Sequence, residues 1–210
     1  MPFIIRNPRT LLLVLFAPLS LGFLCSSCAF GDRHINLTYG SAPAAPVGAV
    51  PATRVAMTQL QDGRPAKENG EKVLGKIRNG YGMPTADVLG VQDPILWVSD
   101  GVARSLTEEG FNVEKVDAPN MAANLPLITG TVTEVSMGMY MHEKVNIASD
   151  LAVERSGQKF GTTKCAGEAG ILAWTGSAAE FEGVFAQAMS SFQADCMSKL
   201  IPLLRSAGSQ

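Results

Sequence analysis

A long amphipathic stretch near the carboxyl end constrains the fold of this 210-residue chain more than any other feature. It opens with Ser177-Ala178-Ala179-Glu180, a capping box in which serine and glutamate side chains satisfy backbone N–H groups at a helix start. Apolar residues then recur at the spacings of three and four that mark one face of a helix. They are Phe181, Val184, Phe185, Ala188, Met189, Phe192, Cys196 and Leu200. Such a face must be buried, so we expect a sheet or a partner to cover it.

A second amphipathic helix is predicted in the middle of the chain. Asp93 can cap its start, and the ring of Pro94 presets the first helical turn. Gly110 is suited to end it. The apolar face of this helix comprises Ile95, Val98, Val102 and Leu106.

Alternation of apolar and polar residues predicts strands in most of the remaining chain. The expected strands cover 35–39, 54–61, 73–78, 127–135, 137–153 and 160–174, with a turn at Ser156-Gly157. The order strands, helix, strands, helix predicts an α+β domain, with a mainly antiparallel sheet covered on one face by the two amphipathic helices.

The amino-terminal segment has the pattern of an export signal. Two arginines, at positions 6 and 9, precede the apolar run 11–24, which is too short and too interrupted by Pro18 for a membrane-spanning helix. A Cys-x-x-Cys metal or redox motif is excluded, because Cys25 and Cys28 would need a second ligand pair or a folded domain around them.

Cys28 is the predicted point of attachment to a membrane. Ser26 and Ser27 are small residues directly before it, as in the cleavage box of bacterial lipoproteins, whereas Cys25 follows the bulky Leu24. We therefore expect cleavage before Cys28 and acylation of its sulfur, with ordinary cleavage or an uncleaved anchor as the alternatives. Ala29 resembles the default sorting signal for the periplasmic face of the outer membrane.

These features divide the chain into four parts. We predict a signal peptide at 1–27, a tether and linker with a short strand at 28–53, a single periplasm-facing domain at 54–205 and a disordered tail at 206–210. Removing 1–27 takes away two of the 17 basic residues and none of the 19 acidic ones, which leaves a net charge of −4. This charge provides no basic field for nucleic acid, so no nucleic-acid partner is expected.

A nucleotide partner is also not expected. The segment Gly70-Glu71-Lys72-Val73-Leu74-Gly75-Lys76-Ile77 differs at a single position from the sequence motif of a phosphate-binding loop. Ile77 stands where a Ser or Thr hydroxyl would bind magnesium, and Asn79-Gly80 interrupts the helix that such a loop must open.

Several segments follow one another along the chain: the cleavage box, then "QDGR", "VLGKIRNGYGMPTADV" and "ILWVSDGVARSLTEEGF", and finally "ITGTVTEV" and "VNIASDLAV" before the last helix. In this succession the chain resembles the YajG-type lipoproteins of bacterial envelopes. The resemblance implies a periplasm-facing lipoprotein of the fold described above, and it supplies no catalytic residues. The segment "TTKCAGEAG" and Cys196 depart from the family pattern.

Two cysteines remain after cleavage and acylation, Cys165 and Cys196. An even remainder in an oxidising compartment suggests a disulfide. Both residues are expected to face the interface between the sheet and the last helix, because Cys196 lies on the apolar stripe and Cys165 shares parity with Ala169. Two separate buried thiols are the alternative.

Few residues suggest a binding or catalytic site. Asp62 and Arg64 could contact a ligand or could stabilise their own turn, and Tyr81 could contact a partner. The alternating methionines of Met137-Gly138-Met139-Tyr140-Met141-His142 suit soft metals such as Cu(I), but their parity matches the expected inward face. We predict no catalytic residue, no metal site and no cofactor.

Two functions of different class follow. The first is a non-catalytic outer-membrane lipoprotein that binds the membrane through its lipid and acts through contacts with another envelope protein. The second is a lipoprotein that binds a small ligand or copper through the methionines or the Asp62–Arg64 turn. We do not expect an enzyme.

Overall fold

A computed structural model of the chain describes residues 31–40, 53–65, 72–78, 81–122, 124–140, 142–171 and 177–209. The predicted lipidation site at Cys28 lies outside these residues. The strands are β1 (Arg33–Ile35), β2 (Arg54–Thr58), β3 (Gln61–Asp62), β4 (Val73–Arg78), β5 (Pro84–Gly90), β6 (Asn112–Val116), β7 (Leu127–Tyr140), β8 (His142–Arg155) and β9 (Gln158–Ile171). The helices are α2 (Pro94–Glu108), the short 3₁₀ helix η1 (Pro119–Ala122) and α3 (Ala178–Gly208).

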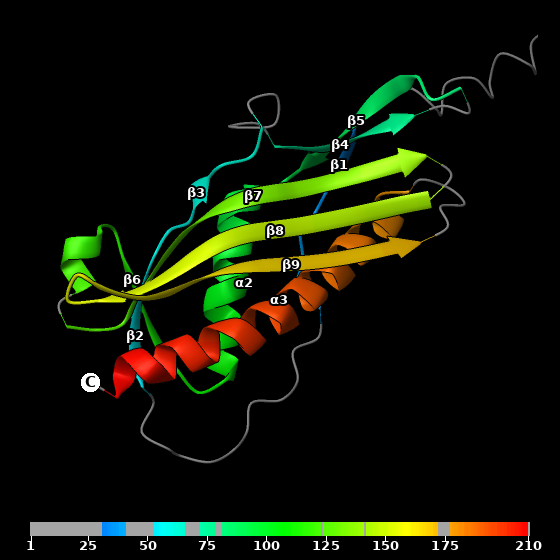
Figure 1. Ribbon diagram of the computed structural model, residues 1–210. Coiled ribbons are helices and arrows are strands. Elements are labelled where there is room, and N and C mark those ends of the chain that lie inside the picture. Colours follow the sequence, from blue (N-terminus) through cyan, green and yellow to red (C-terminus); the bar gives the residue numbers. More distant parts are fainter. Residues whose placement is uncertain are drawn as a thin grey trace, which may run out of the picture.

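The sheet is built around an antiparallel meander of three long strands, β7, β8 and β9. Three short strands pair with β7 in parallel at successive positions: β2 at Leu127 and Ile128, β3 at Thr131 and Val132, and β4 at Met137. β6 extends the sheet beyond β2, and β5 and then β1 extend it beyond β4. Figure 1 shows the resulting large, curled sheet with the meander in front.

The α+β class is confirmed, but the prediction of a mainly antiparallel sheet is wrong. Five strand pairs are parallel, namely β1–β5, β2–β6, β2–β7, β3–β7 and β4–β7. Only β4–β5, β7–β8 and β8–β9 are antiparallel. The reason is connectivity: tight turns join only the antiparallel pairs, and parallel neighbours require the longer excursions that carry α2 and the intervening strands.

Both predicted helices form with the predicted caps. The carboxylate of Asp93 accepts hydrogen bonds from the N–H groups of Ile95 and Leu96, and Ser177 and Glu180 form the capping box of α3. α3 runs along β8 and β9, and α2 contacts α3 (Figure 1). The apolar stripes are buried in one core, in which Phe181, Phe185 and Phe192 are fully covered.

Several predicted boundaries differ from the structure. The short strand expected at 35–39 is β1 at Arg33–Ile35, and it pairs with β5. α3 continues through Gly208 with Ala207 buried, where a disordered tail was expected from 206. The reversal between β7 and β8 falls after Tyr140 rather than near Ser136. β5 and β6 were not predicted, because their short sequences lack a clear apolar alternation.

Among the described residues, no helix combines the length and the apolar character that a membrane-crossing helix requires.

Candidate functional site

The Asp62–Arg64 pair forms a tight turn that follows β3. The carboxylate of Asp62 accepts hydrogen bonds from Nε and Nη2 of Arg64 at 3.0 and 2.9 Å, and from the backbone N–H of Arg64 at 3.1 Å. Between them, the N–H of Gly63 donates to the carbonyl of Val132 in β7 at 2.9 Å. The turn is therefore fastened both to itself and to the centre of the sheet.

The position of Arg64 favours a structural role for this pair. Its side chain is only 1% exposed, and Nη1 also lies 3.5 Å from the carbonyl oxygen of Val73 in β4. A guanidinium needs compensating acceptors when it is removed from water, and Asp62 supplies a bidentate one. The geometry thus matches the turn-stabilising alternative, with the guanidinium directed at the fold rather than at solvent.

Tyr81 lies at the opposite extreme of exposure. It is 91% exposed at the turn of the β4–β5 hairpin, and Met83 beside it is 57% exposed. The side chain of Arg78 reaches across this turn and donates to the carbonyl of Gly82 at 2.8 Å. The hairpin end therefore presents an aromatic, a thioether and a guanidinium to the surroundings.

The structure joins Cys165 of β9 to Cys196 of α3 by a disulfide, with 5.0 Å between their Cα atoms. Both residues face the interface between sheet and helix, as expected from their parity. Gly167, two positions further along β9, lies against the α3 backbone at Ala188 and Phe192, where a Cβ atom would not fit. The disulfide and the glycine together mark the line along which α3 approaches β9 most closely.

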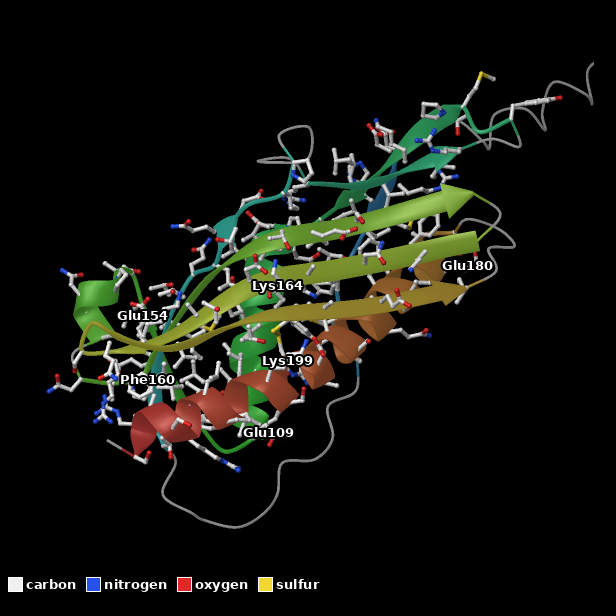
Figure 2. The ribbon with its side chains drawn as sticks, viewed as in Figure 1. Glu109, Glu154, Phe160, Lys164, Glu180 and Lys199 are labelled. Carbon is white, nitrogen blue, oxygen red and sulfur yellow. A yellow bond between two sulfur atoms is a disulfide. The ribbon has the colours of Figure 1, made fainter. Side chains whose placement is uncertain are left out.

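α3 also occupies hydrogen-bonding groups on the free edge of β9. The carboxylate of Asp195 accepts from the N–H of Ala166 at 2.9 Å, and Nζ of Lys199 donates to the carbonyl of Lys164 at 2.7 Å. Asp195 and Lys199 are themselves paired at 2.7 Å. Figure 2 labels Lys164 and Lys199. These side chains cover backbone groups through which an exposed edge would otherwise recruit another strand.

The environment of Asp195 keeps it charged. Burial favours the neutral acid, but the hydrogen bonds from Lys199 and from the N–H of Ala166 outweigh it and lower the pKa of Asp195. The edge contact is therefore maintained by an ionised carboxylate at neutral pH.

Tyr39, which follows β1, packs against Trp97 of α2, and Trp97 in turn packs against α3. Trp97 of α2 is buried, stacks on Tyr39 with ring centroids 6.2 Å apart and meets Phe185 of α3 edge-on. Tyr39 donates its hydroxyl to the carbonyl of Trp97 at 3.0 Å, and Arg104 lies over the Tyr39 ring. Burial, together with the negative charge of Asp100, raises the pKa of Tyr39 to about 12 against the opposing effect of Arg104. Trp97 is thus a core residue.

Two of the surface hollows are lined entirely by described residues. The larger, of about 540 Å³, is a shallow groove over β8 and β9 on the sheet face away from α3. Its lining comprises Gly130, Asp150, Leu151, Ala152, Thr162, Thr163 and Lys164. Small side chains on the outward face leave this space, and Lys164 and Asp150 lie 3.4 Å apart beside it.

The smaller hollow, of about 130 Å³, lies where the parallel strands β2 and β6 end beside α2. Ligands of α/β sheets commonly bind at the carboxyl ends of parallel strands. Here the lining includes Asp100 and Lys115, which form an ion pair at 2.5 Å, and also Asp117. These residues were not predicted from the sequence.

Of the three methionines in the segment 137–142, the structure describes the side chain of Met137. Met137 is 4% exposed and belongs to the apolar core, together with Val135 and Val145. The side chains of residues 139–143 lie outside the described set. Elsewhere in the described ranges, no three His, Cys, Asp or Glu side chains gather as a metal site would require.

Comparison with known proteins gives a likeness at the level of the fold. Protein XCC0632 from Xanthomonas campestris, of the DUF330 family, matches with a TM-score of 0.61 at 9% identity, over 85% of this chain and 99% of that one. A second solved structure, of an uncharacterized protein, matches with a TM-score of 0.50 at 13% identity, over 81% of this chain and 99% of that one.

The solved structures similar to this chain also include a bacterial lipoprotein, GNA1162 from Neisseria meningitidis. The TM-score is 0.35 at 11% identity, over 74% of this chain and 99% of that one. No protein-family model and no curated protein sequence matches the chain. The comparisons therefore establish a fold shared with a DUF330-family protein.

Proposed function

We propose that this chain is a YajG-type lipoprotein, anchored through acylated Cys28 to the periplasmic face of the outer membrane. It acts without catalysis, through contacts with another envelope protein in assembly or maintenance of the envelope. Both the anchoring and the role in the envelope require that the protein is exported to an oxidising compartment.

The disulfide between Cys165 and Cys196 is the observation that carries this proposal. Structural disulfides persist in oxidising compartments such as the bacterial periplasm and are rare in the cytosol. The bridge joins the two cysteines that remain once the signal is removed and Cys28 is acylated. The folded domain thus supports, independently of the leader sequence, the export that the leader predicts.

The polar groups that the sequence offered for chemistry are engaged in the fold. Arg64 is buried against Asp62, and both cysteines of the domain are oxidised. The groove over β8 and β9 supplies a broad, shallow surface with an ion pair beside it, which suits a protein partner better than a small molecule. We assign the partner contact to this groove.

Anchoring is tested by two matched substitutions in the full-length protein. Cys28→Ala should abolish labelling by a fatty-acid probe and release the protein from membranes, whereas Cys25→Ala should leave labelling intact. Labelling that survives loss of Cys28 but is lost with Cys25 would contradict the assignment.

The partner contact is tested by site-specific photo-cross-linking in cells. A cross-linking residue at Thr162, in the groove, should capture a membrane-fraction protein, while the same residue at the exposed Glu109, beyond the end of α2, should not. Lys164→Glu should weaken the Thr162 product by reversing a charge beside the groove. Equal capture at both positions, or a Thr162 product indifferent to Lys164→Glu, counts against this surface.

A further inference from the structure

The turn of the β4–β5 hairpin exposes two large apolar side chains. Tyr81 is 91% and Met83 57% exposed, although β4 and β5 themselves contribute buried residues such as Leu74 and Val88 to the core. Contiguous exposed apolar side chains mark surfaces that meet a partner or a membrane, and here an aromatic ring and a thioether lie two residues apart at one turn.

The path of the amino-terminal chain leads toward this same turn. β1 is parallel to β5, with Arg33 opposite Val88 and Ile35 opposite Gly90. Before β1, the carboxylate of Asp32 accepts a hydrogen bond from the N–H of Asp87 at 2.9 Å. Followed backward from β1, the chain therefore runs along β5 in the direction of Pro84 and the hairpin turn.

Chain length then limits how far the lipid can lie from the turn. Cys28 is three residues before Gly31, and three residues span at most about 10 Å. Continued in the β1 register, Gly31 stands level with Ala86, and Met83 lies another three residues toward the turn. Gly31 and the exposed hairpin end thus belong to one end of the domain, and chain length keeps a lipid on Cys28 within about 10 Å of Gly31.

We propose that the hairpin end formed by Arg78, Tyr81 and Met83 inserts into the headgroup region of the bilayer and orients the anchored domain. This inference rests on the proposed acylation of Cys28. Tyrosine favours the membrane–water interface because its ring is apolar and its hydroxyl polar. Met83 adds apolar area, and the exposed guanidinium of Arg78 can pair with lipid phosphates.

The test measures depth at two exposed positions in the full, acylated protein. Tyr81→Cys is labelled with an environment-sensitive fluorophore and reconstituted into phosphatidylethanolamine–phosphatidylglycerol vesicles that contain nitroxide-bearing lipids. Met121→Cys is the matched control, because Met121 is 58% exposed on η1, beside the start of β7 and away from the hairpin end (Figure 1). We expect a blue shift and loss of fluorescence at position 81, and neither at 121. Arg78→Glu should reduce the quenching at position 81.

Each contrary result has a distinct meaning. Equal quenching at the two positions, in protein whose mass shows acylated Cys28, overturns the inference and leaves the anchoring proposal standing. A blue shift at position 81 that lipid nitroxides do not quench indicates contact with a second copy of the chain, and also overturns it. An unacylated Cys28 refutes the anchoring proposal and with it the premise of this inference.

Discussion

Gly167 of β9 lies so close to the backbone of Phe192 in α3 that a Cβ atom has no room between them. The approach lies two residues from the Cys165–Cys196 disulfide, so helix and strand are joined where they are closest. It also explains the first of the two glycines within "KCAGEAG", Gly167, since β-strands otherwise disfavour this residue.

Gly167→Ala should therefore lower the free energy of unfolding by about 1–3 kcal/mol or more, because α3 must move away from β9. Gly183→Ala is the matched control: Gly183 lies in α3 with nothing near its Cβ position. That change should stabilise the protein by about 0.5–1 kcal/mol through helix propensity. Urea unfolding measures both, and an equal response of the two variants would contradict the close approach.

The disulfide should contribute about 3–4 kcal/mol, because it closes a loop between residues 31 positions apart and restricts the unfolded chain. Reduction should lower the melting temperature of the wild-type domain. The double variant Cys165→Ala/Cys196→Ala should melt at a lower temperature and be indifferent to reductant. Mass spectrometry of the non-reduced, alkylated protein provides the direct check, and two alkylated thiols at these positions would refute the bridge.

Asp62→Asn should be strongly destabilising if the Asp62–Arg64 turn is structural. The substitution removes the carboxylate charge that faces the buried guanidinium of Arg64 at 2.9 Å, at a cost of about 3–5 kcal/mol. Glu114→Gln serves as the control, since its ion pair with Arg54 is solvent-exposed and should be worth less than about 1 kcal/mol. Chemical denaturation of both variants decides the matter. A cost at Asp62 no greater than at Glu114 would favour the ligand-contact alternative.

Tyr39 should make stability fall in alkaline solution. Below its usual pKa of about 10 the phenol is protonated in both states. As the pH rises from about 10 toward the folded-state pKa of about 12, the unfolded chain loses the proton and the folded chain keeps it. The free energy of unfolding therefore decreases over this range. Tyr39→Phe should reduce that slope in urea titrations near pH 11, and an unchanged slope would contradict the raised pKa.

The sequence determined the helices of this protein, because their signals are local. Asp93 and Ser177 cap α2 and α3 through residues two or three positions away, and the apolar stripes repeat within a few turns. Parity within a strand likewise indicated that Cys165 and Met137 face the core. The predictions of an export signal and of lipidation at Cys28 likewise rest on contiguous residues.

Only the tertiary structure decided which strands became neighbours and in which direction. Alternation identifies the buried face of a strand but carries no information about its partner, so the parallel pairing of β2, β3 and β4 with β7 was not predictable from it. Three features depend on those pairings: the burial of Arg64, the groove beside Lys164, and the position of Tyr81 at the end of the domain where β1 begins. They are set by contacts between residues far apart in the chain, which no local pattern encodes.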